Sequence, residues 1–127
     1  MDLLDSKLYD LIGEDGFIRL VAAFYSRVPG DDILGPLYSP NDLPAAEIRL
    51  REFLIMRFGG PEHYFEKRGH PRLRMRHARF HVDRAARDRW VSLMEQALVE
   101  ARFVPEATIV LRKFFDDSAT FLINQPG

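Results

Sequence analysis

The sequence predicts an all-α fold, and three observations lead to this class. Apolar residues recur at the three- and four-residue spacing of a helix face in four long segments. Strand signals are poor, because the pair Asp15-Gly16 lacks the flanking alternation of apolar and polar residues that marks a hairpin. Eight glycines and eight prolines punctuate the chain. Residues 1–127 are therefore expected to form one helical domain, long enough to bury a core without staples.

The N-terminal third predicts a short helix followed by a long one. The short helix covers residues 7–12 and ends at Gly13. The long helix is marked by apolar residues at offsets of 0, 3, 4, 7, 8 and 11: Phe17, Leu20, Val21, Phe24, Tyr25 and Val28. Pro29-Gly30 ends it, and the proline-rich stretch 30–44 is expected to be a loop or a few single turns.

A third helix is expected to begin at Pro44, because proline suits the first turn of a helix. Its repeating positions are Ala46, Leu50, Phe53, Leu54 and Arg57. The run 59–61 (Gly-Gly-Pro) ends this helix, and the run 69–71 (Gly-His-Pro) is a second break. A long helix cannot fit between these breaks, and residues 73–77 are expected to form a short one.

Two long helices are expected in the C-terminal part of the chain. Asp83 is a suitable N-cap for the first of them. Its apolar face consists of Trp90, Leu93, Met94, Ala97, Leu98 and Ala101. The second begins at Pro105 and runs nearly to the end, with Val110, Leu111, Phe114, Phe115, Ala119, Leu122 and Ile123 as its apolar positions. The interrupted stretch in the middle of the domain is typical of a binding region.

Composition excludes whole classes of function. Lys plus Arg is 18 and Asp plus Glu is 19, so a generally basic nucleic-acid binder is not indicated. The absence of cysteine excludes a disulfide framework, a Cys-ligated zinc site, an iron–sulfur cluster and a cysteine nucleophile. No apolar run reaches the roughly 18 residues of a membrane helix, and the N-terminus lacks a signal-peptide pattern. We therefore expect a cytoplasmic protein without a membrane or nucleic-acid partner.

Histidine and arginine cluster in the interrupted middle stretch. His77 and His81 are four residues apart and could chelate a metal on one helix, although no third ligand has matching spacing. An arginine row is formed by Arg72, Arg74, Arg76 and Arg79. It is compatible with a nucleic-acid patch, a solvated helix face or a site for a small dianion, and the row alone does not choose among them.

Aromatic residues are abundant, with ten Phe, four Tyr and one Trp. Tyr25 and Trp90 lie on apolar helix faces, and Tyr38 lies in the proline-rich loop. Each taken alone is most simply a packing residue whose polar tip reaches a partner. A flat, apolar, iron-bearing macrocycle with two carboxylates would use all these features together: an axial His, aromatic walls, cations at the edge, and donors opposite the His.

Several specific runs of sequence support a haem site. The longest is Arg68-Gly69-His70-Pro71-Arg72-Leu73-Arg74-Met75-Arg76-His77-Ala78, and others are Arg49-Leu50-Arg51-Glu52-Phe53-Leu54, Gly59-Gly60-Pro61, Arg87-Asp88-Arg89-Trp90, Phe24-Tyr25 and Leu37-Tyr38. By these runs the chain resembles the group II truncated haemoglobins over residues 8–124. The resemblance implies a truncated globin fold, a two-over-two helical sandwich around haem b. The chain departs from the family in Gly13-Glu14-Asp15-Gly16, one residue shorter than the usual hinge, and in Arg57-Phe58.

The resemblance also assigns roles to individual residues. His77 is the expected iron ligand, and the absence of cysteine leaves no thiolate to compete with it. Tyr25, Tyr38 and Trp90 match the distal ligand-binding residues of the family. The expected haem-binding residues are Ala46, Arg49, Leu50, Phe53, Leu54, Tyr64, Leu73, Arg76 and Phe80, with Met75 beside them. Among these, Ala46 stands where many globins have a distal His, and Arg49, Tyr64 and Arg76 are the expected partners of the propionates.

The function implied is reversible binding of dioxygen or another diatomic ligand at a His-ligated iron. Oxygen storage or transport, nitric oxide detoxification and peroxide chemistry all remain open. A dioxygenase or peroxidase-like turnover would depend on an external reductase, and the family also admits a homodimer. The alternative is a non-haem helical interaction domain whose arginine row binds an anion or an acidic partner. That alternative predicts a colourless protein.

Overall fold

The computed structural model describes residues 7–72, 77 and 82–124. It contains α2 (Leu8–Ser26), the 3₁₀ turn η1 (Gly35–Leu37), α3 (Leu43–Arg57), α4 (His63–Arg68), α6 (Arg84–Ala101) and α7 (Pro105–Phe121). None of the described residues is in a β-strand, so the predicted all-α class is confirmed. Within these same ranges, no helix has both the length and the apolar character needed to cross a bilayer.

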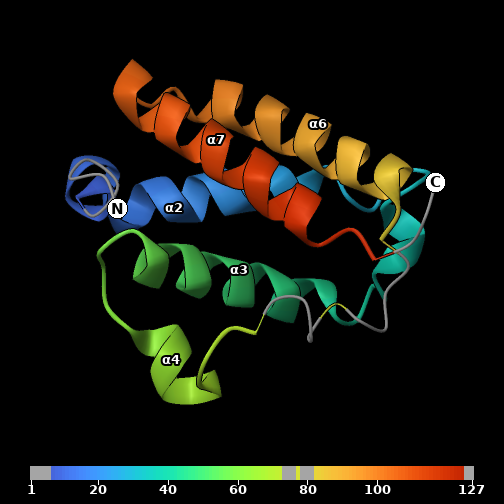
Figure 1. Ribbon diagram of the computed structural model, residues 1–127, viewed down its shortest axis with the longest axis horizontal. Helices are drawn as coiled ribbons and strands as arrows, with labels where there is room; N and C mark the ends of the chain where they lie inside the picture. The colour runs from blue at the N-terminus through green and yellow to red at the C-terminus, as the bar shows by residue number, and fades with distance from the viewer. Residues whose placement is uncertain (1–6, 73–76, 78–81, 125–127) are drawn as a thin grey trace.

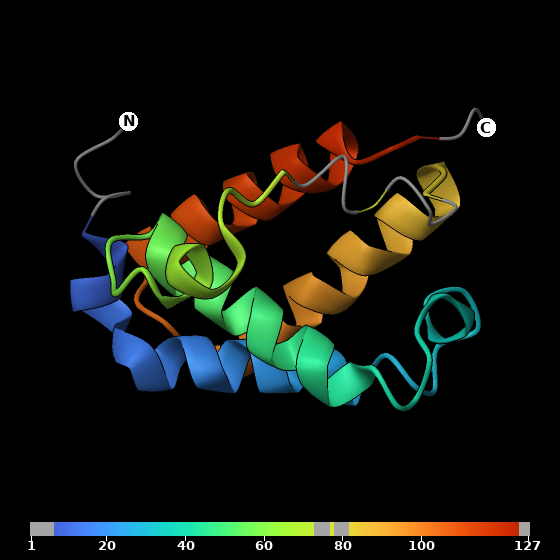
Figure 2. The ribbon, with the colours of Figure 1, turned by 90° about the horizontal axis from the view of Figure 1, so that it is seen from below.

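The long helices form two stacked pairs. Figure 1 shows α6 and α7 side by side above α2, with α3 below, and Figure 2 shows the same arrangement from beneath. Helix α2 is shared between the layers, because it packs against α3, α6 and α7. The short helix α4 follows α3 in the chain and packs against it. This is the predicted two-over-two sandwich.

Local sequence signals account for where the helices begin and break. Gly13 adopts φ 72° and ψ 170° inside α2, a left-handed conformation open to glycine, so the predicted break after the first short helix is confirmed. Pro44 lies in the first turn of α3 and Pro105 in that of α7. The Asp83 carboxylate accepts a hydrogen bond of 2.9 Å from the Ala86 N–H and caps α6 as predicted.

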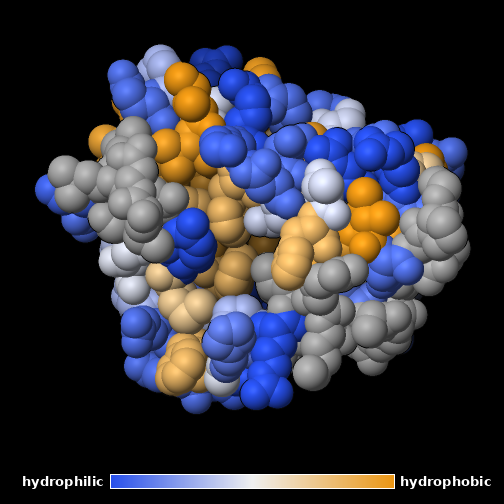
Figure 3. Space-filling view, in the orientation of Figure 1, coloured by the Kyte–Doolittle hydropathy of each residue, from blue (hydrophilic) through white to orange (hydrophobic). Residues whose placement is uncertain are grey.

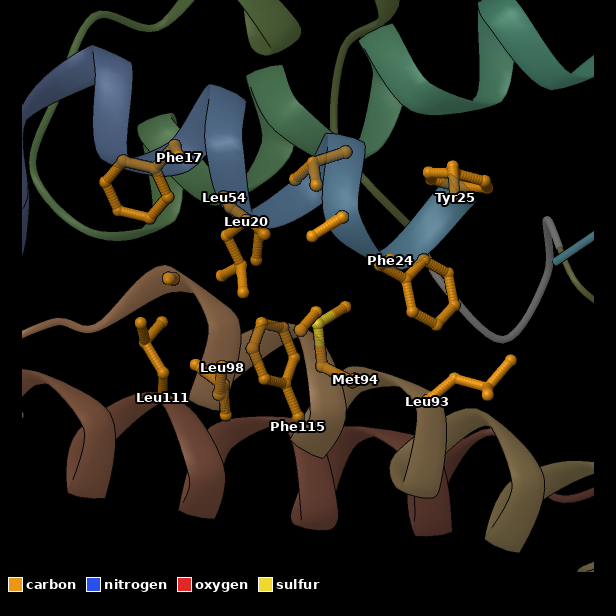
Figure 4. Packing of buried hydrophobic residues seen from close by; sticks show 14 of the residues in the cluster. Phe17, Leu20, Phe24, Tyr25, Leu54, Leu93, Met94, Leu98, Leu111 and Phe115 are labelled. Atoms are coloured by element: carbon orange, nitrogen blue, oxygen red, sulfur yellow. The ribbon is translucent and has the colours of Figure 1, made fainter. Parts of the chain in front are cut away.

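The core lies between α2 and the α6–α7 pair. Figure 4 shows Phe17, Leu20 and Phe24 of α2 directed toward side chains of the opposite layer. Those facing residues are Leu93, Met94 and Leu98 of α6 with Leu111 and Phe115 of α7, each at most 7% exposed. Burying a side chain of this size contributes about 1.5–3 kcal/mol relative to leaving it in water, so this interface is the main support of the fold.

One buried carboxylate ties α4 to α3. The side chain of Glu52 is 11% exposed and accepts hydrogen bonds from Lys67 at 2.8 Å and Arg68 at 2.9 Å. These cations, beginning with Lys67, hold the pKa of Glu52 below its usual range. Exposed ion pairs contribute little, but this one is largely shielded on the carboxylate side, so both cations favour the charged form of Glu52. The contact thus fixes the place of α4 against α3.

We expect Gly60→Ala to destabilise the fold by about 1–3 kcal/mol, because overpacking forces close neighbours to move. A methyl group there would lie 2.6 Å from both the Ile55 side chain and the Tyr9 ring. Urea unfolding measures the change, and Gly30→Ala is the matched control because a methyl at Gly30 meets nothing within 4 Å. Equal unfolding free energies for the two variants would contradict this account of the turn.

Candidate functional site

An apolar hollow opens on one face of the sandwich. Figure 3 shows it near the centre of the view, lined by apolar side chains and surrounded by hydrophilic ones. In the matching ribbon, this part of the face lies between α3 and the α6–α7 pair. A hollow with apolar walls and few polar groups is the usual form of a small-molecule or cofactor site.

Three hydrogen-bond donors meet beside the core, and each comes from a different element. Tyr25 lies in the last turn of α2, Tyr38 directly follows η1, and Trp90 lies on α6. The rings of Tyr25 and Tyr38 meet edge to face with centroids 5.9 Å apart. Tyr38 is hydrogen-bonded to Tyr25 and to Trp90. The structure therefore brings together the three residues that the sequence analysis selected as distal donors.

The direction of these hydrogen bonds leaves one proton available. The indole N–H of Trp90 can only donate, so the Tyr38 hydroxyl oxygen accepts from it. Tyr38 is also hydrogen-bonded to the Tyr25 hydroxyl, and either of these two hydroxyls can be the donor in that bond. A hydroxyl has two acceptor lone pairs and one O–H. The bond between the two tyrosines therefore uses one of their two O–H groups and leaves the other for a further acceptor.

Burial keeps the two tyrosine hydroxyls in their neutral form. Burial is the largest cause that raises the pKa of Tyr25, and the neighbouring Tyr38 raises it further. Burial also raises the pKa of Tyr38, although the hydrogen bonds with Tyr25 and Trp90 and the charge of Arg49 act in the opposite direction. A neutral hydroxyl donates a hydrogen bond, whereas a phenolate cannot. Both tyrosines therefore stay donors well into the alkaline range.

A continuous run of aromatic contacts extends from these donors across the layers. Trp90 packs on Phe24 at 5.0 Å and on Phe115 at 5.6 Å between ring centroids. The run continues from Phe115 to Phe114 (5.7 Å), from Phe114 to Phe53 (6.4 Å) and from Phe53 to Tyr64 (5.7 Å). Residues of α6, α7, α3 and α4 thus form one aromatic framework, whose flat surfaces suit a planar apolar ligand.

The remaining predicted residues of α3 and α4 differ in exposure. Leu50 and Phe53 are partly buried at the edge of the core, whereas Leu54 exposes none of its surface. Ala46 is 6% exposed, and Arg49 is exposed with its charge acting on both Tyr25 and Tyr38. Tyr64 is buried, with the Arg68 guanidinium over its ring at 5.3 Å. Leu50 and Phe53 therefore leave part of their apolar surface accessible, whereas Leu54 belongs wholly to the core.

His77 is partly exposed, and its backbone is tied to the C-terminal end of the chain. The side-chain amide of Asn124 donates to the His77 carbonyl at 3.1 Å and accepts from the Val82 N–H at 2.9 Å. Asn124 follows α7, so its one side chain joins His77 to the start of α6. The predicted residues Leu73, Met75, Arg76 and Phe80, the second histidine His81, and Arg74 and Arg79 of the arginine row lie outside the described residues.

The sequence reasoning missed three polar residues that organise the site. Glu52 holds α4, Asn124 binds the His77 carbonyl, and Arg89 joins α6 to Asp31 in the loop before η1. None of these three carries a local signal, although their partner Asp31 does, because Asp commonly accepts hydrogen bonds from backbone N–H groups two and three residues on. The other contacts join residues far apart in the chain, and no spacing rule predicts them.

The residues present suit a haem group. The hollow offers apolar walls for the macrocycle, and the tyrosine and indole donors offer hydrogen bonds to a polar ligand. Arg49 is exposed and close enough to the tyrosines for its charge to influence their pKa, which suits a carboxylate near these donors. No group of three or more His, Asp or Glu side chains within residues 7–72, 77 and 82–124 could hold a metal ion by itself.

Comparison with known proteins gives consistent results. The family model of bacterial-like globins matches residues 7–122. The chain is 34% identical over 117 residues to the group 2 truncated hemoglobin YjbI of Bacillus subtilis, which covers 92% of this chain and 88% of that protein. The hemoglobin of Chloroflexus aurantiacus is 42% identical with a TM-score of 0.89, over 93% of this chain and 98% of that one. A thermostable hemoglobin of Thermobifida fusca is 39% identical with a TM-score of 0.91, over 94% and 98%.

The two stacked helix pairs, the apolar hollow and the cluster of three donors are the features of a small globin. The chain belongs to the bacterial-like globin family, and its relatives are group II truncated haemoglobins. Membership implies a haem cofactor and haem-based binding of a diatomic ligand.

Alkaline titration tests the state of the two buried hydroxyls. An ordinary tyrosine ionises near pH 10, whereas Tyr25 and Tyr38 ionise at higher pH. We therefore expect that neither Tyr25→Phe nor Tyr38→Phe changes the rise in tyrosinate absorbance that the folded protein shows near pH 10. Because folding raises these pKa values, their contribution to stability is complete below about pH 10 and is lost as the pH rises further. In denaturant, either substitution should remove about a quarter of the step, since the chain has four Tyr. If either substitution lowered the absorbance change of the folded protein near pH 10, the raised pKa of that tyrosine would be contradicted.

Proposed function

We propose that this globin binds haem b through His77 and retains dioxygen reversibly through Tyr38, Tyr25 and Trp90. The observation that carries the proposal is the convergence of these three donors, with Tyr38 hydrogen-bonded to the other two. A truncated haemoglobin of Bacillus subtilis described as oxygen-avid is 33% identical to this chain with a TM-score of 0.87. It supports retention of oxygen as the primary activity.

The proposed binding of haem divides among side chains by their chemistry. The neutral imidazole of His77 would supply the axial bond to iron, and haem held in this way supplies reversible binding of a diatomic ligand. Leu50 and Phe53 form the distal wall, and Ala46 leaves space beside them. Leu54 supports that wall from the core, and Leu73 and Phe80 are proposed as further walls. Arg49, Tyr64 and Arg76 are the proposed partners of the propionates.

The three donors would slow the release of a polar diatomic ligand held beside them. The O–H that the bond between Tyr25 and Tyr38 leaves over would donate to this ligand, while the Trp90 indole would hold the Tyr38 oxygen in place. A hydrogen bond to a partly charged acceptor contributes about 1–3 kcal/mol. Burial contributes as well, because it keeps both tyrosines protonated.

Oxygen retention takes precedence over redox turnover in this proposal, since the described donors act by holding a ligand. Nitric oxide oxidation or peroxide reduction needs electrons, so either reaction would make the chain depend on an external reductase. A cytoplasmic setting and a homodimer are compatible with the proposal and do not carry it. The competing interaction-domain hypothesis depends on the arginine row, of which the described part of the chain contains only Arg72.

The absorption spectrum tests the axial ligand. We expect the haem-supplied protein to show a strong Soret band, and His77→Gly to reduce or shift it because the axial nitrogen is lost. His63→Gly is the control, since His63 is exposed on α4 and pairs with Glu66 at 3.8 Å. A colourless native protein, or a spectrum unchanged in His77→Gly, would overturn the assignment.

Rapid-mixing kinetics test the donors. We expect Tyr38→Phe to speed oxygen dissociation from the ferrous protein roughly ten- to a hundredfold, because one hydrogen bond of about 1–3 kcal/mol is lost. Trp90→Phe should act in the same direction. Tyr9→Phe serves as the control, since Tyr9 stacks on Phe17 in the core rather than on the donors. Identical rates for Tyr38→Phe, Tyr9→Phe and the native protein would refute the role of Tyr38.

A further inference from the structure

An ion pair beside Trp90 crosses from α6 to the loop that carries Tyr38. The same Arg89 nitrogen, Nη1, donates to the Asp31 carboxylate at 2.5 Å and to the Asp32 carboxylate at 2.8 Å. We call these three residues the Arg89 clamp. The Asp31 side chain is 7% exposed, whereas that of Asp32 is 83% exposed. Asp31 is therefore the partly buried anchor of the clamp, and Asp32 is its solvated arm.

The loop between Asp31 and Tyr38 is connected by a series of short hydrogen bonds. The second carboxylate oxygen of Asp31 accepts from the backbone N–H groups of Ile33 (3.0 Å) and Leu34 (2.7 Å). The Asp31 carbonyl accepts from the Gly35 N–H at 3.0 Å, and the Gly35 carbonyl accepts from the Tyr38 N–H at 3.2 Å. A displacement of Asp31 would therefore be transmitted through η1 to Tyr38.

The loop and α6 thus meet at two adjacent positions of the helix. Arg89 binds Asp31, and the next residue, Trp90, donates to the Tyr38 hydroxyl. Removing the guanidinium would leave the largely shielded Asp31 carboxylate without its charged partner and without its tie to α6, although the Ile33 and Leu34 N–H groups would still bind it. Asp31 would then be free to move toward water. Such a movement would pull Tyr38 away from Trp90.

We propose that Arg89 is a positioning residue for the distal donors. By fixing Asp31, it sets the separation between Tyr38 and Trp90 and so the rate at which the bound ligand escapes. The proposal rests on the proposed function, because it takes Tyr38 and Trp90 as the groups that hold the ligand. It predicts that ligand retention depends on a residue that does not itself face the ligand.

Amide hydrogen exchange of the purified protein tests the clamp without depending on ligand binding. We expect Arg89→Met to speed exchange at Leu34, Leu37 and Tyr38 at least severalfold, because the hydrogen bonds of this loop open more often. Arg112→Met is the matched control. Arg112 of α7 likewise binds a carboxylate on another element, Glu95 of α6, at 2.6 Å, and it lines an open groove whose residues include none of the three donors.

Oxygen dissociation and the stretching frequency of bound carbon monoxide test the consequence for the ligand. We expect Arg89→Met to release oxygen severalfold faster and to shift the carbon monoxide frequency in the direction that Tyr38→Phe shifts it. Arg89→Lys should recover part of both effects, since a single charged donor still reaches Asp31. Asp32→Asn weakens only the solvated arm and should give a smaller change in both measurements. Because Asp32 is exposed, this variant is expected to fold even if Arg89→Met does not. Arg112→Met should resemble the native protein.

The outcomes separate the clamp from the proposed function. If Tyr38→Phe speeds oxygen release but Arg89→Met changes neither exchange nor release, the clamp is refuted and the proposed function stands. If Arg89→Met and Arg112→Met speed exchange and release equally, the effect is a general loss of stability and the clamp is again refuted. If no haem is bound, the proposed function fails, and the exchange measurement alone decides whether Arg89 orders the loop.

Discussion

The packing of Phe24 against Trp90 is the contact on which the site depends. Phe24 points from α2 into the apolar core, and its ring lies 5.0 Å from that of Trp90 on α6. The Phe24 ring also meets the Tyr25 ring edge to face at 5.0 Å, so Phe24 contacts both the Trp90 and the Tyr25 rings, whose polar groups are hydrogen-bonded to Tyr38. The apolar interface between the two layers thus supports the positions of these polar groups.

Hydrogen bonds and an ion pair then fix the polar side chains of the site. Tyr38 lies in a loop rather than on a long helix, so its position depends on hydrogen bonds more than on core packing. Hydrogen bonds to Tyr25 and Trp90 hold its oxygen, and Asp31 with Arg89 hold the loop from which it extends. Donors fixed in advance in this way lose little entropy when a ligand arrives, which makes their hydrogen bonds more effective.

Local patterns in the sequence predict most of the fold and only part of the site. The break at Gly13, the start at Pro44 and the cap at Asp83 follow from short-range rules, because each depends on neighbouring backbone groups. The three donors are predicted by the family resemblance alone, since no local pattern indicates that Tyr38 and Trp90 contact each other. Arg89 and Asp31 are 58 residues apart, and only the folded arrangement of α6 and the loop before η1 reveals their contact. The positions of Leu73, Arg76 and Phe80 stay predictions.

A crystal structure of the ferric protein with haem and cyanide would measure the central claim most directly. The account predicts that a ring nitrogen of His77 binds the iron and that the Tyr38 hydroxyl lies about 2.5–3.0 Å from the cyanide, with Trp90 still donating to Tyr38. Iron bound by another residue, or a cyanide whose distal side faces neither Tyr38 nor Trp90, would contradict it.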